Sequence, residues 1–427
     1  MKRLLALMTT VCLVAVAGLS GCSPSEGTGG GKRTEIDFWY TWMGDGSTSM
    51  KKLIDEFNRS QDEVYVNGLA QGDLRKQMTA IVGGNPPDLA SLPDEINLAS
   101  WADKGAMMPL DAYIKKDGYD MEDYLPAARD AVTYEGKTYG LPLGMNTWML
   151  YYNKDLLKKA GFDRPPETIQ ELKKYEAKLS EEKNGRITRL GLWPGQIPHV
   201  WMQSFEGRLW DPEAKKVTPL DPGFKSAVEL TSSVWQKHGP EKIDRLLAGN
   251  GNYGSPQNPF ATGKYAMTLD GEWLAPILGK NAPKLNYDVA PLPYDENHPE
   301  AKNAGYINVN LLYIPKKADE PEAAWKFMSW LAKKEQMVKF DKALGNLPPR
   351  KSAMDDPAFK DVPKFDRFLK YANSEKMEPL PSLPFMEKYM QEIHKQNDQI
   401  NRGKVPVEKG LKDVETKIQP LVEKTMK

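Results

Sequence analysis

Apolar and polar positions near residue 36 alternate with the period of a strand. Ile36, Phe38 and Tyr40 are separated by Asp37 and Trp39, and this alternation predicts a β-strand. The next segment, TWMGDGSTS, has the composition of a loop. Apolar residues at helical spacing follow it, namely Met50, Leu53, Ile54 and Phe57. They predict a helix, and Ser47 is its expected N-cap.

The pattern repeats directly afterwards. Val64–Val66 is a second predicted strand, Leu74, Met78, Ile81 and Val82 have helical spacing, and NPPDLASL leads into a third strand. Alternating strands and helices predict an α/β fold with a parallel sheet. Ligands of such sheets bind at the carboxyl ends of the strands, so the TWMG and PDE loops are expected at the binding edge.

A second region of mixed structure begins near TWMLYYNKDLLKKAGF. It contains the predicted helix TIQELKKYEAKL, the aromatic loops GLWPGQIPHVW and FEGRLW, and strands at Tyr287–Ala290 and Val309–Ile314. One helix is predicted over Pro321–Phe340, with Ala324, Phe327, Met328 and Leu331 on one face. The last sixty residues are predicted to be helical except around EPLPSLP and RGKVP.

The charge and the aromatic content of the chain limit the classes of ligand that it could bind. The chain has 58 Lys and Arg against 58 Asp and Glu, and 56 against 58 without Lys2 and Arg3. Because there is no basic excess, we expect no nucleic-acid partner. The chain also has 11 Trp and 18 Tyr. Large aromatic side chains are either core or contact surface, so some of them are candidates for a binding site.

The N-terminus predicts export. Lys2 and Arg3 precede an apolar run, residues 4 to 17, that is too short for a comfortable membrane span. Leu-Ser-Gly-Cys at residues 19 to 22 resembles a bacterial lipobox. It implies a signal peptide over residues 1–21 and lipidation of Cys22, with palmitate as an expected acyl group. Ordinary secretion is the alternative. Residues 22–33 would then be the lipidated cysteine and a Gly/Ser-rich segment that is expected to act as a flexible tether.

Several ordered segments resemble the extracellular solute-binding proteins of sugar ABC transporters, the group that includes the maltose-binding protein. They are GNPPDLASLPDE, EGKTYGLPLGMNTWMLYYNKDLLKKAG, GKYAMTLDGEW with YDVAPLP, EAAWKFMSWLAKKEQMVKF with GNLPPRKSA, and INRGKVPVEKGLKDVETKI. Each segment is weak alone, but together they cover nearly all of the chain beyond the tether, in the family's order.

The resemblance implies a two-lobed α/β fold of the periplasmic-binding-protein type, with interlobe crossovers as the hinge. The N-terminal lobe would comprise residues 34–146 plus 302–346, and the C-terminal lobe residues 147–301 plus 347–427. The crossovers would lie near Asn146, between Pro291 and Gly305, and near Leu347.

Candidate binding residues in the first lobe and the crossovers combine aromatic faces with polar groups, as a sugar site requires. Trp42 follows the first strand and is either a sugar platform or a lid over the lobe core. Asp94 matches a ligand-binding aspartate of the maltose-binding protein, and it is alternatively a helix N-cap. Asn146 and Trp148 fall at the first crossover. Asn146 replaces a glutamate found in the maltose-binding protein, which makes maltose doubtful as the ligand.

Candidates in the second lobe are mainly tryptophans. Trp273 in DGEW matches the family's Gly-x-Trp, whose ring stacks on sugar. Of the two tryptophans in GLWPGQIPHVW, Trp201 is the predicted cleft residue and Trp193 the predicted packing residue. Tyr306, just after the second crossover, either donates its hydroxyl to ligand or packs in the hinge.

These observations predict an extracytoplasmic, lipid-anchored monomer that binds a sugar or oligosaccharide and delivers it to ABC permease subunits. No enzymatic activity is expected. No cofactor or metal is expected, because the four histidines are scattered in the sequence. One alternative is a receptor for a peptide or polyamine, which would need converging carboxylates. Another is a secreted glycoside hydrolase, which would need two placed carboxylates. Asp94 with Glu95, and Asp270 with Glu272, are too close in sequence to be such pairs.

Overall fold

The computed structural model describes residues 33–425, and the predicted signal peptide, Cys22 and most of the tether lie outside this range. The strands are β1 (Thr34–Tyr40), β2 (Val64–Ala70), β3 (Leu89–Leu92), β4 (Thr133–Tyr134), β5 (Lys137–Thr138), β6 (Leu141–Asn153), β7 (Glu181–Lys183), β8 (Arg186–Trp193), β9 (Trp210–Asp211), β10 (Lys216–Val217), β11 (Tyr265–Gly271), β12 (Tyr287–Ala290), β13 (Gly305–Tyr313) and β14 (Met377–Glu378).

The helices are α1 (Gly44–Ser60), α2 (Leu74–Gly83), α3 (Leu98–Asp103), α4 (Asp111–Asp117), α5 (Pro126–Asp130), α6 (Lys154–Lys159), α7 (Ile169–Leu179), α8 (Pro198–Trp201), α9 (Pro222–His238), α10 (Pro240–Ala248), α11 (Leu274–Asn281), α12 (Pro321–Leu331), α13 (Lys334–Leu344), α14 (Lys351–Met354), α15 (Phe365–Ala372), α16 (Met386–Asn401) and α17 (Val407–Thr425). Short 3-10 helices are η1 (Met202–Phe205), η2 (Pro299–Ala301) and η3 (Pro357–Phe359). No helix in the described part of the chain is long and apolar enough to cross a membrane.

The main sheet has the strand order β2-β1-β3-β13-β6-β11-β8-β7, with β12 paired to β6 and β14 to β13. The pairing of β1 with β2 and β3 is parallel, which confirms the parallel α/β arrangement predicted for the first hundred residues. The loops after β1 and β3 therefore share the carboxyl edge of this sheet, and Trp42 and Asp94 lie in them.

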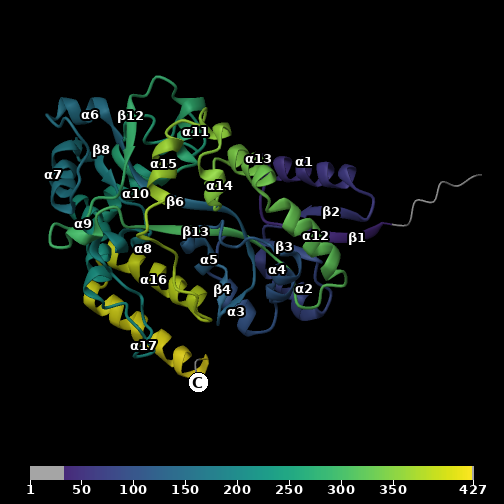
Figure 1. Ribbon diagram of the computed structural model, residues 1–427. Helices are drawn as coiled ribbons and strands as arrows, with labels where there is room; N and C mark the ends of the chain where they lie inside the picture. The colour runs from purple at the N-terminus through teal and green to yellow at the C-terminus, as the bar shows by residue number, and fades with distance from the viewer. Residues whose placement is uncertain (1–32, 426–427) are drawn as a thin grey trace, which may run out of the picture. The chain divides into compact units, whose positions relative to one another are not determined.

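Two long strands join the two halves of this sheet. β13 pairs with β3 through Leu311–Tyr313 and with β6 through Ile307–Leu312. β6 continues beyond this ladder and pairs with β11 and β12. Figure 1 shows β6 and β13 running between the elements around β1–β3 and those around β8 and β12. Asn146 and Trp148 lie on β6, and Tyr306 lies near the start of β13.

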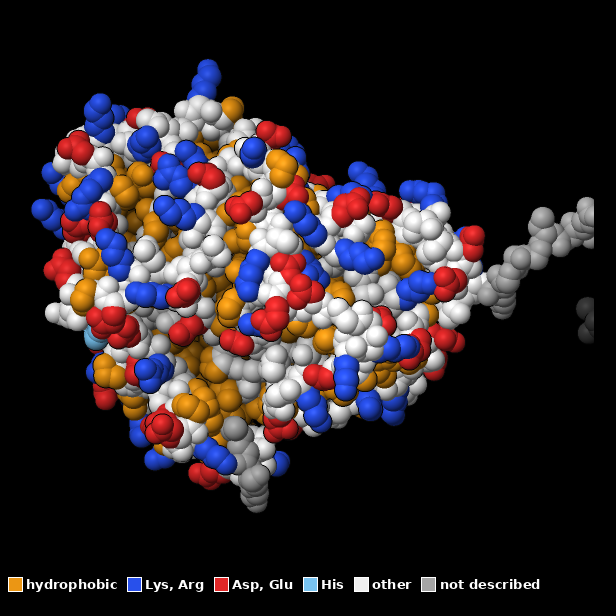
Figure 2. Space-filling model, viewed as in Figure 1, with side chains coloured by type: hydrophobic (Ala, Val, Ile, Leu, Met, Phe, Trp, Pro, Cys, Tyr) orange, Lys and Arg blue, Asp and Glu red, His pale blue; other side chains and the backbone are white. Residues whose placement is uncertain are grey.

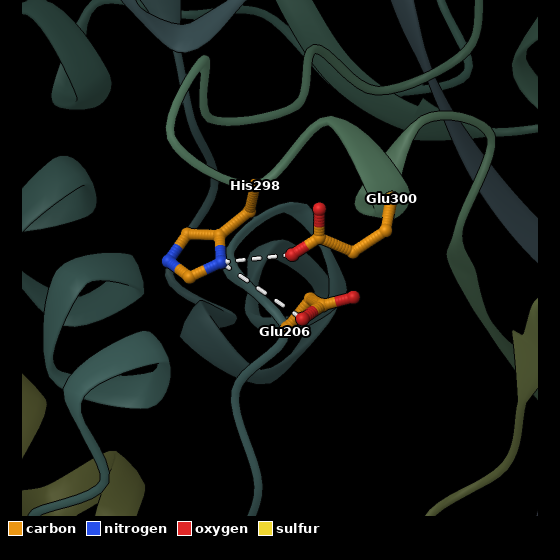
Figure 3. A group of neighbouring side chains, drawn as sticks. All are labelled: Glu206, His298 and Glu300. Carbon is orange, nitrogen blue, oxygen red and sulfur yellow. Dashed lines mark hydrogen bonds and ion pairs between the residues drawn. The ribbon is translucent and has the colours of Figure 1, made fainter.

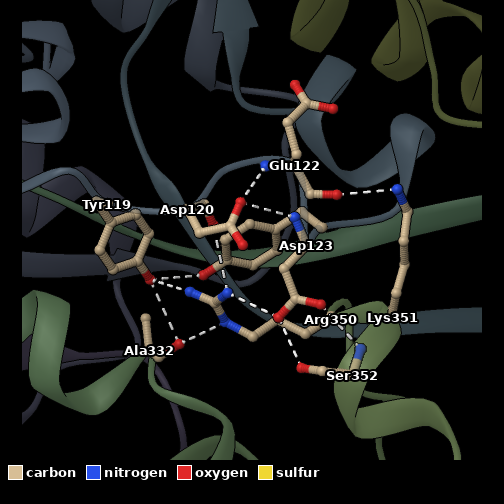
Figure 4. Close-up of polar contacts among 9 residues, drawn as sticks. Tyr119, Asp120, Glu122, Asp123, Ala332, Arg350, Lys351 and Ser352 are labelled. Carbon is tan, nitrogen blue, oxygen red and sulfur yellow. Dashed lines mark hydrogen bonds and ion pairs between the residues drawn. The ribbon is translucent and has the colours of Figure 1, made fainter.

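A third connection passes beside β6. Met145 and Leu347 exchange two backbone hydrogen bonds, of 2.8 and 2.9 Å. Directly after it, Arg350 is buried between the rings of Tyr119 and Tyr124. Its guanidinium donates to Asp123 at 3.0 Å and to the hydroxyl of Tyr119 at 2.6 Å (Figure 4). Arg350 thus links the segment that follows Leu347 to the loop before α5 by hydrogen bonds.

Apolar periodicity explains most of the helices. The predicted faces of α1 and α12 are buried in one core with β1–β3. The single helix expected over Pro321–Phe340 is divided, because Lys333 is extended and the carbonyl of Ala332 accepts from Arg350 at 2.9 Å. The expected cap at Ser47 is wrong. The helix already begins after Met43, and the Ser47 hydroxyl lies 3.2 Å from that of Tyr40.

Candidate functional site

Three of the predicted site residues form one aromatic group. Trp148 on β6 stacks on Tyr306 of β13, with centroids 5.3 Å apart and planes at 24°. Trp273, directly after β11, meets Trp148 edge to face at 5.5 Å and 87°. Trp148 and Trp273 are half-buried, so part of each ring surface stays exposed. Such partly exposed aromatic faces suit the apolar face of a ring-shaped ligand.

A glycine positions Trp273. A Cβ atom added at Gly271 would lie 2.3 Å from the indole ring of Trp273, well inside any real contact. Only glycine lets the ring fold back over the strand end at this point. This contact gives a physical reason for the spacing of the DGEW segment.

A cavity of about 340 Å³ lies beside Trp148, within the range of small-molecule sites. Its lining residues include Trp193, Tyr253, Asp270 and Leu269. Trp193 stacks on Tyr265 at 5.6 Å and 16° and is half-buried. The cavity therefore combines aromatic walls with one carboxyl group.

Burial raises the pKa values of two carboxyl groups near the aromatic group, those of Asp270 and Glu272. Burial raises the pKa of Asp270 to about 7, although hydrogen bonds from Tyr253 and Trp273 oppose the rise. The Tyr253 hydroxyl donates to Asp270 Oδ1 at 2.8 Å. Burial also raises the pKa of Glu272 well above its usual range, while its Oε2 accepts from the backbone N–H of Thr147 at 3.1 Å.

The remaining polar candidates lie at the connecting strands and after β3. Asn146 donates through Nδ2 to Asn308 Oδ1 at 2.8 Å, which links β6 to β13 by side chains. Asp94 accepts from the backbone N–H of Ile96 at 3.1 Å, a contact of the capping type expected as its alternative role. Asp94 is nevertheless half-exposed, and burial raises its pKa.

Two predicted tryptophans lie elsewhere. Trp42 packs edge to face on Phe340 at 4.8 Å and 79°, half-buried over the core of the β1–β3 region. Trp201 is fully buried, and its indole N–H donates to the carbonyl of Pro194 at 2.8 Å. Trp201 therefore offers no face to a ligand in this structure. The partly exposed tryptophan of that loop is Trp193, for which the sequence predicts a packing role.

Several residues around the site were not predicted. Tyr253 lies in a Gly- and Asn-rich loop without any apolar period, so no local signal marked it. Glu95 and His199 both approach Tyr306: the Glu95 carboxylate is 3.5 Å from its hydroxyl, and the His199 ring meets it edge to face at 5.2 Å. Only the pairing of distant strands brings these side chains together.

A separate surface cluster joins His298 to two glutamates (Figure 3). His298 Nδ1 lies 3.2 Å from Glu300 and 3.8 Å from Glu206. Glu206 is far from the other two residues along the chain, so the sequence gives no signal for this grouping. All three side chains are more than 40% exposed, and ion pairs of this kind are common on surfaces, so we assign no metal to them.

Comparisons with known proteins add to this geometry. A sequence profile of the family described as bacterial extracellular solute-binding protein matches residues 52–367. The sn-glycerol-3-phosphate-binding periplasmic protein UgpB of Pectobacterium atrosepticum is 27% identical over 361 residues, 80% of this chain and 78% of that protein. The maltotriose-binding protein of Pyrococcus abyssi is 26% identical over 339 residues, 77% and 69% of the two chains.

Solved structures with the same fold include sugar complexes. CpMnBP1 with mannotriose bound has a TM-score of 0.80 and 29% identity, and the match covers 90% of this chain and 99% of that chain. The sugar-binding protein MalE of Xanthomonas citri has a TM-score of 0.76 and 23% identity, over 92% and 98% of the chains. At that identity the likeness concerns the fold alone, and the fold is two-lobed.

Proposed function

Since the chain belongs to the bacterial extracellular solute-binding proteins, we propose that its solute is a neutral oligosaccharide, which it delivers to an ABC importer. The observation that carries this proposal is the aromatic group of Trp148, Trp273 and Tyr306 beside a 340 Å³ cavity. The relatives named for maltotriose and mannotriose support the same ligand class.

A phosphate-bearing ligand is less compatible with this site, although one relative is named for sn-glycerol-3-phosphate. No Lys or Arg is among the residues that line the cavity, and Asp270 is there. An anion in this cavity would meet a carboxyl group and no fixed cation, which is unfavourable at low dielectric. Figure 2 likewise shows acidic and basic side chains mixed over the viewed face, without a basic patch.

The sugar site that we propose differs in one residue from the sequence expectation. Trp148 and Trp273 would form the aromatic wall, and Tyr306, which is only 3% exposed, would support the Trp148 ring from behind. Asn146 would lie at the crossover, and Trp193 would take the place of Trp201. Trp42 and Asp94 follow β1 and β3 and would form the opposite wall. The proposed lobe limits remain residues 34–146 plus 302–346 and 147–301 plus 347–427.

Two other functions are less well supported. A polyamine receptor would need several ionised carboxylates at the ligand, whereas burial raises the pKa values of Asp94, Asp270 and Glu272. A glycoside hydrolase would need a free carboxylate pair across a scissile bond. Glu95 and Glu272 instead accept from backbone N–H groups. The relatives are binding proteins, and we propose that this chain has no catalytic activity and no cofactor.

Differential scanning fluorimetry of residues 33–427 against mannose- and glucose-based oligosaccharides tests the ligand class, with sn-glycerol 3-phosphate as the anionic comparison. A ligand at 100 times its dissociation constant stabilises the folded state by about 2.7 kcal/mol. We expect an oligosaccharide to raise the melting temperature and the phosphate to leave it unchanged. Stabilisation by the phosphate alone would contradict the proposal.

We further propose that the protein is a monomer held at the membrane by lipid on Cys22. The support is the lipobox-like sequence Leu-Ser-Gly-Cys after a short apolar run. Cys22→Ala should release the protein from the membrane fraction or stall its processing. An unmodified Cys22 in the intact mass of the mature wild type would contradict the anchor.

A further inference from the structure

The β6–β13 ladder places two amide side chains next to the aromatic group. Asn146 and Trp148 are two residues apart on β6, so they lie on the same face of the sheet. Asn308 and Tyr306 are likewise two residues apart on β13. Asn146 and Asn308, which we call the amide pair, are register partners in the ladder. Because the ring of Trp148 stacks on that of Tyr306, this face carries an aromatic pair and, one position further along, the amide pair.

The two amides bind each other and keep unused hydrogen-bonding groups. Asn146 Nδ2 donates to Asn308 Oδ1 at 2.8 Å. Neither side chain makes another hydrogen bond among residues 33–425. The Asn146 oxygen and the Asn308 nitrogen are therefore free to bind a ligand, and neither is a fully buried atom. If both amides were turned over, the pair would still leave one acceptor and one donor free.

The next amide along β13 differs, because the protein already satisfies it. Asn310 donates through Nδ2 to the carbonyl of Pro93 and accepts through Oδ1 from Asn346 at 2.8 Å. Its register partner, Gly144, has no side chain. Asn310 is thus a structural contact between the β3 turn, β13 and the third connection, whereas the amide pair has hydrogen-bonding capacity left for a ligand.

The amide pair is within reach of a sugar ring held at Trp148. Residues two apart on a strand are separated by about 6.6–6.8 Å. Trp148 and Asn308 are half-buried and Asn146 is 8% exposed, so each of the three side chains keeps some accessible surface. A sugar ring whose apolar face lies on Trp148 would place hydroxyl groups of its rim toward the amide pair.

We propose that Asn308 is a specificity-determining residue: together with Asn146 it binds two neighbouring hydroxyl groups of the sugar, accepting from one and donating to the other. The inference rests on the proposed function and deepens it, because it requires two free, adjacent hydroxyl groups on one ring of the ligand. The hydrogen bond between the amides fixes both side chains before the ligand binds, which lowers the entropic cost of binding. A sugar without a hydroxyl group at either place would leave a polar group of the pair unpaired.

Isothermal titration of wild type, Asn308→Ala, Asn308→Leu and the control Asn67→Ala, with mannotriose and maltotriose as probes, tests this role. Asn67 is an exposed asparagine on the edge strand β2. Each Asn308 variant should raise the dissociation constant of the better-bound trisaccharide about tenfold, the effect of losing the hydrogen bonds to one pair of hydroxyl groups. The ratio of the two dissociation constants should move toward one, because the amide pair distinguishes hydroxyl positions. Asn67→Ala should change neither constant.

Adding Asn146→Ala to Asn308→Ala should weaken binding by much less than the product of the two single effects, since each amide holds the other. A merely structural amide pair would lower the melting temperature of both Asn308 variants and leave the ratio of the dissociation constants as in wild type, which would overturn the proposal. Wild-type affinity in Asn308→Leu would overturn it as well, and the proposed function would stand. If wild type binds neither trisaccharide, the proposed ligand class and the role of Asn308 fail together.

Discussion

At the scale of single residues, Trp273 has the largest predicted effect on binding. It is half-buried, it contacts Trp148, and Gly271 leaves room for its ring. Trp273→Ala should weaken oligosaccharide binding by roughly 2–4 kcal/mol, because buried aromatic side chains dominate such sites. Isothermal titration measures the change.

Trp210→Ala is the matched control, since Trp210 is also half-buried but packs on Phe385 away from the site. Equal affinities of Trp273→Ala and wild type would refute the proposed site.

The two tryptophans of the loop GLWPGQIPHVW should respond in opposite ways. Trp201 is fully buried with its N–H bonded, so Trp201→Ala should cost about 3–5 kcal/mol of folding stability and leave the affinity of the folded fraction nearly unchanged. Trp193 lines the cavity, so Trp193→Ala should mainly weaken binding. Urea unfolding and titration of each variant separate the two effects. The reverse outcome would restore the sequence-based assignment.

The sequence could not separate these two residues, because both stand in one aromatic loop with the same composition. Their difference comes from the turn at Pro194 and from the packing of α8 on α9. By contrast, Trp148, Trp273 and Tyr306 were predicted through the family resemblance, and the structure brings them together. Tyr253 and Glu95 gave no local signal, since their roles depend on contacts with residues distant in sequence.

At the scale of elements, the third connection depends on Arg350. Its side chain is buried between two tyrosines and pairs with Asp123. Arg350→Met keeps the length of the side chain but leaves Asp123 without its cation. We expect a loss of about 3–5 kcal/mol in the free energy of unfolding, as for other broken buried pairs. Arg245→Met is the control, because Arg245 is largely exposed and its pair with Glu241 should contribute little. Equal losses in the two variants would contradict this role.

Local periodicity predicted the elements better than their ends and pairings. β12 and the buried faces of α1 and α12 agree with the sequence pattern. The break between α12 and α13 was not predictable, because it depends on Arg350 reaching Ala332 from the other side of the connection. The long ladder of β6 with β13 joins segments more than 150 residues apart, so no local pattern in the sequence indicated it.

At the scale of the whole molecule, buried carboxyl groups should set the pH dependence of stability. Burial raises the pKa values of Glu95 to about 8 and of Asp270 to about 7, and those of Glu272 and Asp341 well above their usual range. In the unfolded chain these groups lose their protons near pH 4. Between that pH and their folded pKa values the folded state binds more protons, so stability falls as the pH rises.

Urea unfolding at pH 5.5, 6.5, 7.5 and 8.5 tests this expectation. The free energy of unfolding should decrease over the series, and Glu272→Gln should reduce the decrease because the amide does not ionise. A free energy independent of pH would mean that these carboxyl groups are hydrated or paired in solution. The comparison is made without ligand, because a saccharide would add its own pH-dependent binding term.

Closure around the ligand is the property that needs the whole molecule. We predict that an oligosaccharide draws together the two proposed walls, with Trp42 and Asp94 on one and Trp273, Trp148 and Trp193 on the other. The strands β6 and β13 and the connection at Leu347 would form the hinge. A ligand shifts the population toward a closed state only if it contacts both walls, because contact with one wall favours neither state.

Small-angle scattering should therefore show a smaller radius of gyration at saturating oligosaccharide in wild type. Asp94→Ala, saturated with the same ligand, should compact less, since one wall loses its polar contact. A saturated wild type without compaction would place the ligand on a single wall, even if the affinity of Trp273→Ala were reduced as predicted.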